Sequence, residues 1–358
     1  MNIGISTVHY AHNYGAMLQG YALKTILEQM GHNVVMVEKR TVALTKWSPR
    51  PLTKCSLKEI LLYPKYLYKW YLPVYRTKKK RERNFEKFLW TYLNDKPYNG
   101  EKLDAIIYGS DQIWSKYKYG FDEIWWGLKD SNTGKRISYA VSMGVLEIEE
   151  EDEAFVKNAL ARFAAVSVRE KNLQNYLNAR HLFNKQVELM IDPTFLLSKE
   201  KWSKINPKRI IKEPYLLFYD FQNDKETTRI AHYIAEQKHL RIIRLSNGVE
   251  HVNREEGYLV TAGPIEFISL FRYANFVVSS SFHGTAFSII FNKPFYARQI
   301  WNTDRVKTLL DIMGLSNRFI EHVDDVDISK SIDYNLVNQK IEYHRQKGIA
   351  YLMNELSN

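Results

Sequence analysis

The stretch Asn275-Phe-Val-Val-Ser-Ser-Ser-Phe-His-Gly-Thr-Ala-Phe-Ser-Ile-Ile-Phe-Asn-Lys-Pro294 predicts a strand, a loop and a helix in direct succession. Phe276 to Val278 is a short β-prone run, Ser279 to Gly284 has the composition of a loop, and Thr285 to Asn292 is an apolar helical segment that ends before Pro294. The apolar residues after this proline suit the next strand. The stretch therefore predicts a parallel βαβ unit, whose first loop opens onto a ligand crevice.

The loop of this unit is suited to hold an anion. A helix directs its free N–H groups and the positive end of its dipole toward whatever lies at its N-terminus. Three serines, Gly284 and Thr285 surround that point, and His283 is the only side chain of the loop that titrates near neutrality. Two plainer interpretations stay open: the serines only cap the helix, and His283 is an ordinary loop histidine.

The size and composition indicate a globular protein of two domains. A chain of 358 residues exceeds the usual size of one hydrophobic core, and 45% hydrophobic with 25% charged residues is an ordinary composition. No apolar run has the length of a membrane span, and the N-terminus lacks the sections of a signal peptide, so we expect a cytoplasmic protein. The single cysteine, Cys55, excludes an internal disulfide and a multi-cysteine zinc site, and we expect neither a metal nor a cofactor.

The net charge of +11 gives little support to a nucleic-acid partner. The sequence contains no recognition-helix motif, zinc-finger spacing or RRM signature, so we expect no nucleic acid to bind. Much of the excess charge lies in Arg76–Arg83 and is therefore local. An anionic membrane surface and an acidic substrate are the remaining explanations.

The first half of the chain predicts a doubly wound α/β domain. Residues 1–7 and 32–38 have strand patterns, and Tyr14 to Met30 has apolar residues at helical spacing. The loop at 8–15 lies at the predicted crevice but lacks the glycine spacing of a dinucleotide site. Four further strands each run into polar residues: 104–108, 137–141, 165–168 and 187–191. Polar groups therefore gather at one edge of one sheet.

The second half predicts another α/β domain. Residues 198–214 are rich in lysine and have little periodicity, which favours a linker. Strand and helix patterns alternate again from Tyr215, and Leu336 to Leu356 predicts a closing helix. We therefore predict domains at 1–198 and 199–330, with 331–358 packing back on the first domain.

An aromatic and basic insert interrupts the first domain between residues 56 and 94. Interfacial aromatics followed by basic residues are typical of a peripheral membrane helix, although Pro64 and Pro73 interrupt a long one. The alternative is a surface helix whose aromatic side chains pack on the domain. We expect the insert to be dispensable for folding and to assist contact with a membrane or a lipid-linked acceptor. The residues expected on one helical face are Phe85, Phe88, Leu89 and Tyr92.

Over most of its length the chain resembles the polysaccharide pyruvyl transferases. The resemblance rests on five motifs: Ala11-His-Asn-Tyr-Gly-Ala-Met-Leu-Gln19, Asp104-Ala-Ile-Ile-Tyr-Gly-Ser-Asp-Gln-Ile-Trp114, Val166-Ser-Val-Arg-Glu-Lys171, Ile191-Asp-Pro-Thr194 and Ser280-Ser-Phe-His-Gly-Thr-Ala-Phe-Ser-Ile-Ile290. Each is weak alone, and together their order and spacing are specific for the family but not for a substrate. The resemblance implies two Rossmann-like domains that face each other as in GT-B glycosyltransferases. It also implies transfer of pyruvate from phosphoenolpyruvate (PEP) to a sugar as a ketal.

The resemblance makes His283 the catalytic acid and base beside a bound PEP. Members of the family carry an arginine two residues before this histidine, where the chain has Ser281, so the donor or its mode of binding is in question. Arg169 matches the second basic position of the family, and three further cations are near enough in sequence to compensate: Lys293, Arg298 and Arg305. The predicted donor-binding residues are Arg169, Ser280, Ser281, Gly284, Thr285 and Arg305.

The acceptor is expected to be a sugar of a surface polysaccharide or capsule, or its lipid-linked precursor, bound in the crevice of the first domain. Aromatic faces with amide or carboxylate groups suit a pyranose ring. The plainer alternative is that Asp111 only caps a helix and Trp114 only fills the core. The predicted acceptor-binding residues are His12, Asn13, Tyr14, Ser110, Asp111, Gln112 and Trp114.

Two other functions stay open. Ser281 favours a nucleotide-sugar glycosyltransferase of the same architecture, and the insert favours a non-catalytic, membrane-associated component of polysaccharide assembly. The sequence does not determine the oligomeric state.

Overall fold

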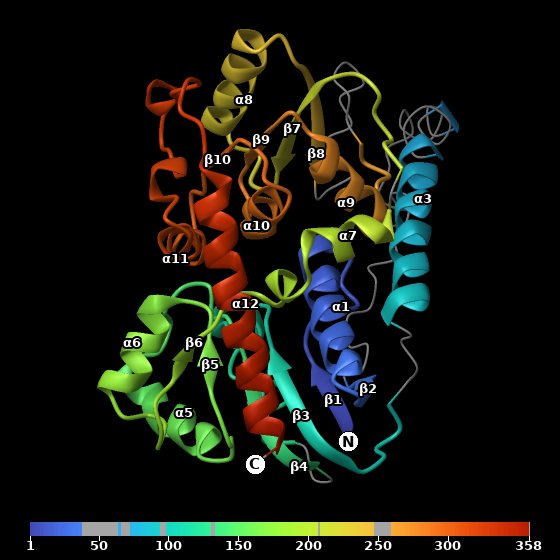
Figure 1. The fold of residues 1–358 in the computed structure, drawn as a ribbon. Helices are drawn as coiled ribbons and strands as arrows, with labels where there is room; N and C mark the ends of the chain where they lie inside the picture. The colour runs from blue at the N-terminus through green and yellow to red at the C-terminus, as the bar shows by residue number, and fades with distance from the viewer. Residues whose placement is uncertain are drawn as a thin grey trace, which may run out of the picture.

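The computed structural model describes residues 1–37, 64–65, 72–93, 98–129, 133–206, 208–246 and 259–357. Two parallel sheets lie one above the other in Figure 1, with helices packed around each. The chain is thus an α/β protein with two facing Rossmann-like domains, and the predicted fold class is confirmed. Cys55 and most of residues 56–71 lie outside the described residues.

The first sheet has the order β2-β1-β3-β4, and all its pairs are parallel. A short parallel pair, β5 and β6, continues it through bridges from Ile137 to Ala165 and from Val141 to Val168. The carboxyl ends of all these strands therefore point the same way. The strands are β1 (Asn2–Ser6), β2 (Asn33–Met36), β3 (Leu103–Gly109), β4 (Thr133–Tyr139), β5 (Ser167–Val168) and β6 (Glu188–Leu189).

The first sheet is covered on both faces, which explains why its central strand β3 is buried along almost its whole length. Ile107 of β3 faces the core cluster that contains α1, whereas Ile106 and Tyr108 face a second cluster with residues of α5 and α6. Asn13 caps α1 by accepting hydrogen bonds from the first-turn N–H groups. The remaining elements of this domain are α1 (Tyr14–Gln29), α4 (Lys116–Tyr119), η4 (Glu150–Asp152), α5 (Glu153–Leu160), α6 (Lys171–Ala179) and η5 (Pro193–Leu196).

The second sheet has the order β10-β9-β7-β8 and is also parallel. Successive residues of β7 face opposite clusters, with Leu217 in the main core and Phe218 in an outer one. Its strands are β7 (Tyr215–Asp220), β8 (Arg241–Ser246), β9 (Phe276–Ser279) and β10 (Phe295–Ala297). Its helices and turns are α8 (Lys225–Gln237), α9 (Pro264–Tyr273), α10 (Phe282–Ile290), α11 (Asp304–Met313), η6 (Ser316–Arg318) and η7 (Val323–Asp325).

The segment between the sheets is more ordered than its composition indicates. Helix α7 (Lys199–Ile205) lies in the stretch expected to be a linker, with Ser198 as its N-cap. Trp202 is fully buried and donates from Nε1 to the carbonyl of Thr194 at 2.9 Å. One buried tryptophan thus anchors a stretch that is otherwise rich in exposed lysine.

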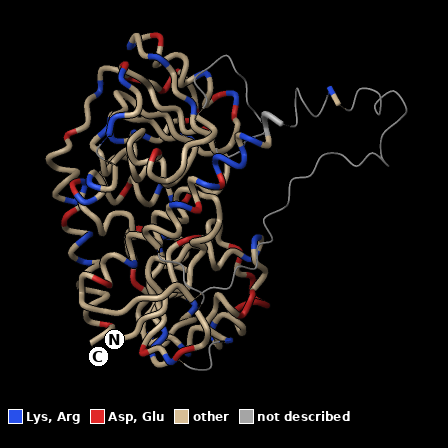
Figure 2. The backbone as a smooth tube through the Cα atoms, turned by 90° about the vertical axis from the view of Figure 1, so that its right-hand side faces the viewer, with Lys and Arg blue, Asp and Glu red and all other residues tan. Residues whose placement is uncertain are grey.

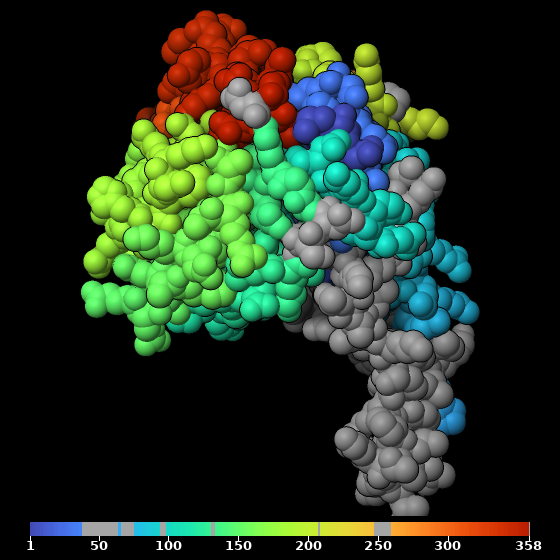
Figure 3. All heavy atoms as spheres, turned by 90° about the horizontal axis from the view of Figure 1, so that it is seen from below, coloured from blue at the N-terminus to red at the C-terminus, as the bar shows by residue number. Residues whose placement is uncertain are grey.

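Helix α12 (Tyr334–Ser357) runs from the second domain down the first one (Figure 1). Arg345 donates to the carbonyl of Phe195 at 2.9 Å, and the Tyr351 hydroxyl donates to that of Ser138 at 3.0 Å. In Figure 3 this red helix lies against both the blue and the green parts of the first domain. None of the described helices is long and apolar enough to cross a membrane.

The described part of the insert is helix α3 (Leu72–Phe88) and the π-helical turn η3 (Leu89–Leu93). Phe85, Phe88 and Leu89 are buried, so the predicted apolar face is real. Arg81 is also buried, at 4% exposure, and donates to the Tyr14 hydroxyl at 2.8 Å and the Val260 carbonyl at 3.3 Å. The expectation that the insert is dispensable for folding therefore conflicts with the packing of α3, which joins the two domains.

Candidate functional site

The predicted site lies at the N-terminus of α10. This helix starts at Phe282, three residues earlier than predicted, because Ser281 takes an extended backbone and becomes the N-cap. The first helical hydrogen bond runs from the Thr285 N–H to the Ser281 carbonyl at 3.0 Å. His283 therefore lies in the first helical turn, where the helix dipole favours an anion.

The predicted polar residues of this turn mostly shape the backbone. The Ser280 hydroxyl accepts from the N–H groups of Phe221 and Gln222, at 2.7 and 3.2 Å, and the Thr285 hydroxyl donates to the Ser281 carbonyl at 3.1 Å. Both side chains are fully buried. Their predicted role as direct donor ligands is thus unsupported, and their hydroxyls hold the turn.

Gly284 is required by close packing. A Cβ there would lie 2.0 Å from Ser279 Oγ and 2.7 Å from a ring carbon of Tyr219. The glycine lets α10 start directly against β7 and β9. It is a packing residue that brings the free N–H groups of the helix to the sheet edge.

His283 lies between the two domains. Its Nε2 is 3.5 Å from Asp192 Oδ2, and its ring lies so close to Gly15 in α1 that a Cβ there would be 1.9 Å from Nδ1. The side chain is 7% exposed. The second domain thus supplies a histidine that rests on the first.

Asp192 is the centre of this site. In the sequence it stands out only as part of the motif Ile191-Asp-Pro-Thr194. Oδ1 accepts from the Thr194 N–H at 2.9 Å and its hydroxyl at 2.7 Å, while Oδ2 accepts from Ser110 Oγ at 3.0 Å and pairs with Arg169. Burial alone would raise the pKa of Asp192, but the nearby His283 and Arg169 lower it well below its usual range. Asp192 is therefore a buried carboxylate.

Arg169 and Arg305 both lie against the ring of Phe282, the first residue of α10. The Arg169 Cζ is 4.3 Å from the ring centroid and that of Arg305 is 5.7 Å. The Nε and Nη2 atoms of Arg169 and the Nε of Arg305 are buried without a hydrogen-bond partner among the described residues. Buried unpaired donors are costly, so these atoms mark the place where an anionic ligand would be stabilised.

Of the three cations expected near Ser281, Arg305 is the one that lies against the first residue of α10. Burial, then the charge of Arg169, lowers the pKa of Arg305 to about 10, so it stays a cation at neutral pH. The other two candidates lie elsewhere. Arg298 pairs with Asp224, and burial together with the nearby charge of Lys199 lowers the pKa of Lys293 to about 8.

A third cation, Lys118, approaches the same cluster. Burial lowers the pKa of Lys118. The charges of Arg305 and Arg169 lower it further, whereas the charge of Asp111 raises it. Its ammonium donates to Gln112 Oε1. Sequence reasoning missed Lys118 because no local pattern distinguishes it from a surface lysine.

Glu170 closes the same edge of the first domain. Its Oε1 accepts from the Ser142 hydroxyl and from the Gly144 N–H at 2.8 Å, while Oε2 is buried and has no hydrogen-bond partner in the described part of the chain. It lies beside Arg169 in sequence, and it is 1% exposed. The dipeptide is therefore not the surface ion pair that such sequences usually form.

Two of the predicted acceptor residues are core residues, which corrects the expectation for them. Trp114 is 1% exposed, stacks on Trp126 at 4.5 Å and donates to the Trp125 carbonyl at 3.0 Å. Tyr14 is fully buried, donates to the Ala262 carbonyl at 2.8 Å, and has its pKa raised to about 12 by burial. Neither offers a ring face to a sugar.

The other predicted acceptor residues lie in three different environments. Asn13 caps α1, and His12 packs on Phe85 with its pKa lowered by burial. Ser110 binds Asp192, beside the predicted donor residues. The remaining acceptor residues, Asp111 and Gln112, lie near Lys118.

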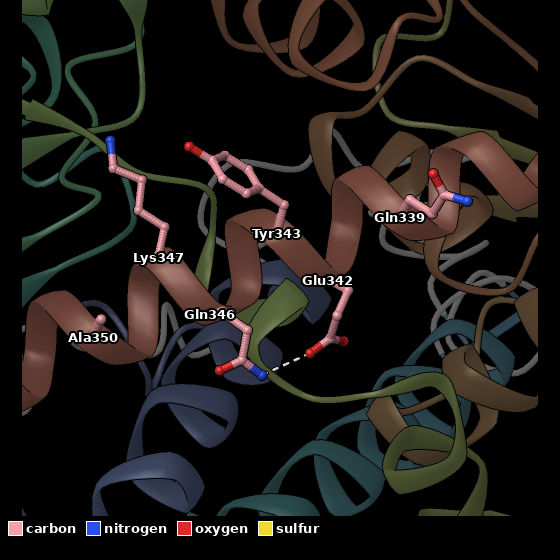
Figure 4. A pocket seen from close by; sticks show the side chains of 6 residues that line it. All are labelled: Gln339, Glu342, Tyr343, Gln346, Lys347 and Ala350. Carbon is pink, nitrogen blue, oxygen red and sulfur yellow. Dashed lines mark hydrogen bonds between the residues drawn. The ribbon is translucent and has the colours of Figure 1, made fainter.

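A separate surface hollow runs along α12 (Figure 4). Its lining residues are Gln339, Glu342, Tyr343, Gln346, Lys347 and Ala350, and the Gln346 amide donates to Glu342 at 2.7 Å. None of them belongs to the cluster around Asp192. Nor do the described residues contain a group of three or more His, Cys, Asp or Glu side chains placed to hold a metal ion.

Comparison with known proteins gives one sequence-level match. The family model described as polysaccharide pyruvyl transferase matches residues 13–298, which include every residue of the cluster except Arg305. No curated protein sequence matches the chain.

Three solved structures that are similar to the chain share little sequence with it. The UDP-GlcNAc 2-epimerase from Neisseria meningitidis bound to UDP-GlcNAc is 10% identical, with 99% of each chain covered and a TM-score of 0.48. The UDP-GlcNAc 2-epimerase from Methanocaldococcus jannaschii is 11% identical, with 96% of this chain and 92% of that chain covered and a TM-score of 0.46. The E. coli heptosyltransferase WaaC with ADP is 12% identical, with 96% and 100% covered and a TM-score of 0.42.

Proposed function

Because the chain belongs to the polysaccharide pyruvyl transferase family, we propose that it transfers pyruvate from PEP to a sugar, forming a ketal. The observation that supports this donor is the pair of guanidinium groups that lie against the ring of Phe282, with buried N–H groups that have no partner among the described residues. They lie at the N-terminus of α10, where an anion is favoured. The ligand that suits this arrangement is small and carries more than one negative charge.

In this proposal Arg305 binds the anionic donor in place of the arginine that other members of the family carry at the position of Ser281. PEP carries a phosphate and a carboxylate, and each is suited to the planar donors of one arginine. The α10 N–H groups supply further donors in the same direction. In this proposal Arg169 and Arg305 bind the donor, while Ser280, Gly284 and Thr285 shape the turn beneath it.

His283 is the proposed proton-transfer residue. In the reaction one sugar hydroxyl adds to C2 of PEP while C3 receives a proton and becomes a methyl group. A second hydroxyl then forms the other C–O bond as the bond to the phosphate oxygen breaks, and its proton leaves with phosphate. His283 protonates C3 and accepts a hydroxyl proton, and Asp192 keeps a negative charge 3.5 Å from its ring.

The acceptor in this proposal is a sugar of a surface polysaccharide or its lipid-linked precursor. The exposed face of α3 and η3 supports contact with an anionic membrane on the cytoplasmic side, because α3 is basic there and η3 carries Trp90 at 56% exposure. This face is turned toward the viewer in Figure 2. Its exposed cations are Arg76, Lys79, Lys80, Arg83 and Lys87.

The decisive experiment measures donor binding and turnover together. Calorimetry with PEP, and phosphate release from PEP in the presence of p-nitrophenyl hexopyranosides, should both give a signal with wild type. His283→Ala should lower kcat by about a hundredfold or more and leave the PEP Kd within about threefold.

Two other results would each favour another candidate function. Binding of UDP-sugars without binding of PEP would favour a nucleotide-sugar glycosyltransferase, which the serine at position 281 still supports. Binding of neither donor would favour the non-catalytic assembly component. Either result would reject the pyruvyl transfer proposal.

A further inference from the structure

The loop between β10 and α11 carries an exposed tryptophan four residues before Arg305, one of the proposed donor-binding residues. Trp301 is 51% exposed, and so is its neighbour Ile300. Phe221, which follows β7, is 40% exposed. These three residues, here called the apolar rim, follow the carboxyl ends of two strands, where ligands of parallel sheets bind.

Hydrogen bonds tie the rim to the turn that holds His283. The Ser280 hydroxyl accepts a hydrogen bond from the Phe221 N–H, and the Ser280 carbonyl accepts one from the Gln299 amide at 3.3 Å. The side chain of Gln222 accepts from the Ile300 N–H at 2.8 Å and donates to the Trp301 carbonyl at 3.4 Å. The rim is therefore positioned by the same serine that shapes the start of α10.

The loop is also fixed at its far end. Four residues after Trp301, Arg305 lies against the ring of Phe282. Asn302 between them has a φ of +58°, a left-handed conformation that asparagine tolerates better than most residues. The loop that carries Trp301 is thus held at both ends against the start of α10. Gln299 contacts Ser280, and Arg305 contacts Phe282.

The Trp301 indole has no partner of its own in the described part of the chain. Only its backbone carbonyl accepts a hydrogen bond, and no ring stacks on it. A large aromatic held at half exposure next to a polar cluster is a surface ready for a ligand with an apolar face and a polar edge. A pyranose ring has this character, since its C–H groups cover one face and its hydroxyls form the edge.

We propose that Trp301, with Ile300 and Phe221, is the platform that holds the acceptor pyranose over the donor site. The inference rests on the proposed pyruvyl transfer and adds a residue from the second domain to acceptor recognition. It also replaces the aromatic faces of Tyr14 and Trp114, which the core buries. The hydroxyl edge of the sugar then faces His283 and the first-domain residues Asp111 and Gln112.

The test compares Trp301→Ala and Trp301→Phe with Trp90→Ala, a change at a similarly exposed tryptophan on η3. With p-nitrophenyl hexopyranosides at saturating PEP, Trp301→Ala should raise the acceptor KM about tenfold or more and change kcat less than threefold. Trp301→Phe should retain most of the affinity. The PEP Kd should stay within twofold in all three variants.

A second readout keeps this test separate from the donor assignment. Saturation-transfer NMR with the same glycosides, without PEP, should lose the signal of the sugar C–H groups in Trp301→Ala alone. An unchanged KM and NMR signal would overturn the platform even if PEP turnover is confirmed. A weaker PEP Kd in Trp301→Ala would assign the residue to the donor instead, which also overturns it, whereas loss of PEP turnover in wild type rejects only the pyruvyl transfer.

Discussion

Gly15 in the first domain supports the ring of His283 from the second, and a Cβ at position 15 would come within 1.9 Å of Nδ1. The contact joins the first turn of one helix to the first turn of another, across the domain boundary. The position of the proposed acid and base therefore depends on the absence of a side chain 268 residues earlier in the chain, between positions 15 and 283. This relationship gives the first prediction.

Gly15→Ala should displace His283 and lower kcat by about tenfold to a hundredfold, because proton transfer depends on close positioning. PEP affinity should change little. Gly20→Ala in the same helix is the matched control, since a Cβ there meets its nearest atom at an ordinary 3.5 Å and should leave kcat unaltered. Steady-state phosphate release measures both, and equal activities in the two variants would contradict the proposed role of the contact.

Asp192→Asn should destabilise the protein by about 3–5 kcal/mol at neutral pH, because it leaves the buried Arg169 without its anionic partner. The pKa of Asp192 is lowered in the folded state, so its charge stabilises the fold above the unfolded pKa near 3.9 and this contribution is lost as the pH falls toward the folded value. The difference between variant and wild type should therefore narrow below about pH 4. Urea unfolding at several pH values measures this, and a constant difference down to pH 3 would contradict it.

Arg305→Gln should weaken PEP binding by about tenfold to a hundredfold, the usual cost of losing one charge-assisted contact. Lys307→Gln, two residues further on in α11, is the control because this exposed lysine lies over Phe319 and away from Phe282. Calorimetry with PEP measures both variants. If Arg305→Gln binds PEP as wild type does, another cation takes the place of the family arginine.

Two variants of α3 separate its buried and exposed faces. Arg81→Met should lower the free energy of unfolding by about 1–3 kcal/mol, since the carbonyls of Ser246 and Val260 and the Tyr14 hydroxyl lose a shared donor. Chemical denaturation measures this cost. A stability equal to that of wild type would restore the view that this helix is dispensable.

Replacing Lys79, Lys80 and Arg83 by Gln should instead leave stability unchanged and reduce sedimentation with vesicles of phosphatidylcholine and phosphatidylserine. The loss should be larger at low salt, because screening weakens exposed charges. The matched control replaces three exposed lysines elsewhere: Lys157, Lys199 and Lys225. Equal sedimentation of both triple variants would reject membrane contact through α3.

The sequence predicts the elements around the site well and their side-chain environments poorly. The strand before Ser280 and the helix after it are determined by local pattern, and so is the presence of His283 at a helix N-terminus. Local pattern also shows that Phe85 and Phe88 share one helical face, but not that this face fills the boundary between two domains.

The errors all concern contacts between distant residues. Trp114 has the sequence context of a crevice residue, and only its stacking on Trp126 and the clustering with Phe163 show that it is core. Asp192 follows a strand as other polar residues do, and its importance depends on Arg169 and Ser110, which lie 23 and 82 residues away. The periodicity of the sequence does not indicate contacts between residues so far apart in the chain.

The course of α12 has a mechanical consequence. The chain passes from the first domain to the second before β7 and returns along one unbroken helix of 24 residues, which contacts Phe195 and Ser138 on the way. A two-way connection of this kind permits bending about the crossing points but resists sliding and separation of the domains. His283 and Asp192 should thus return to the same relative position each time the two domains close, without a new search for alignment.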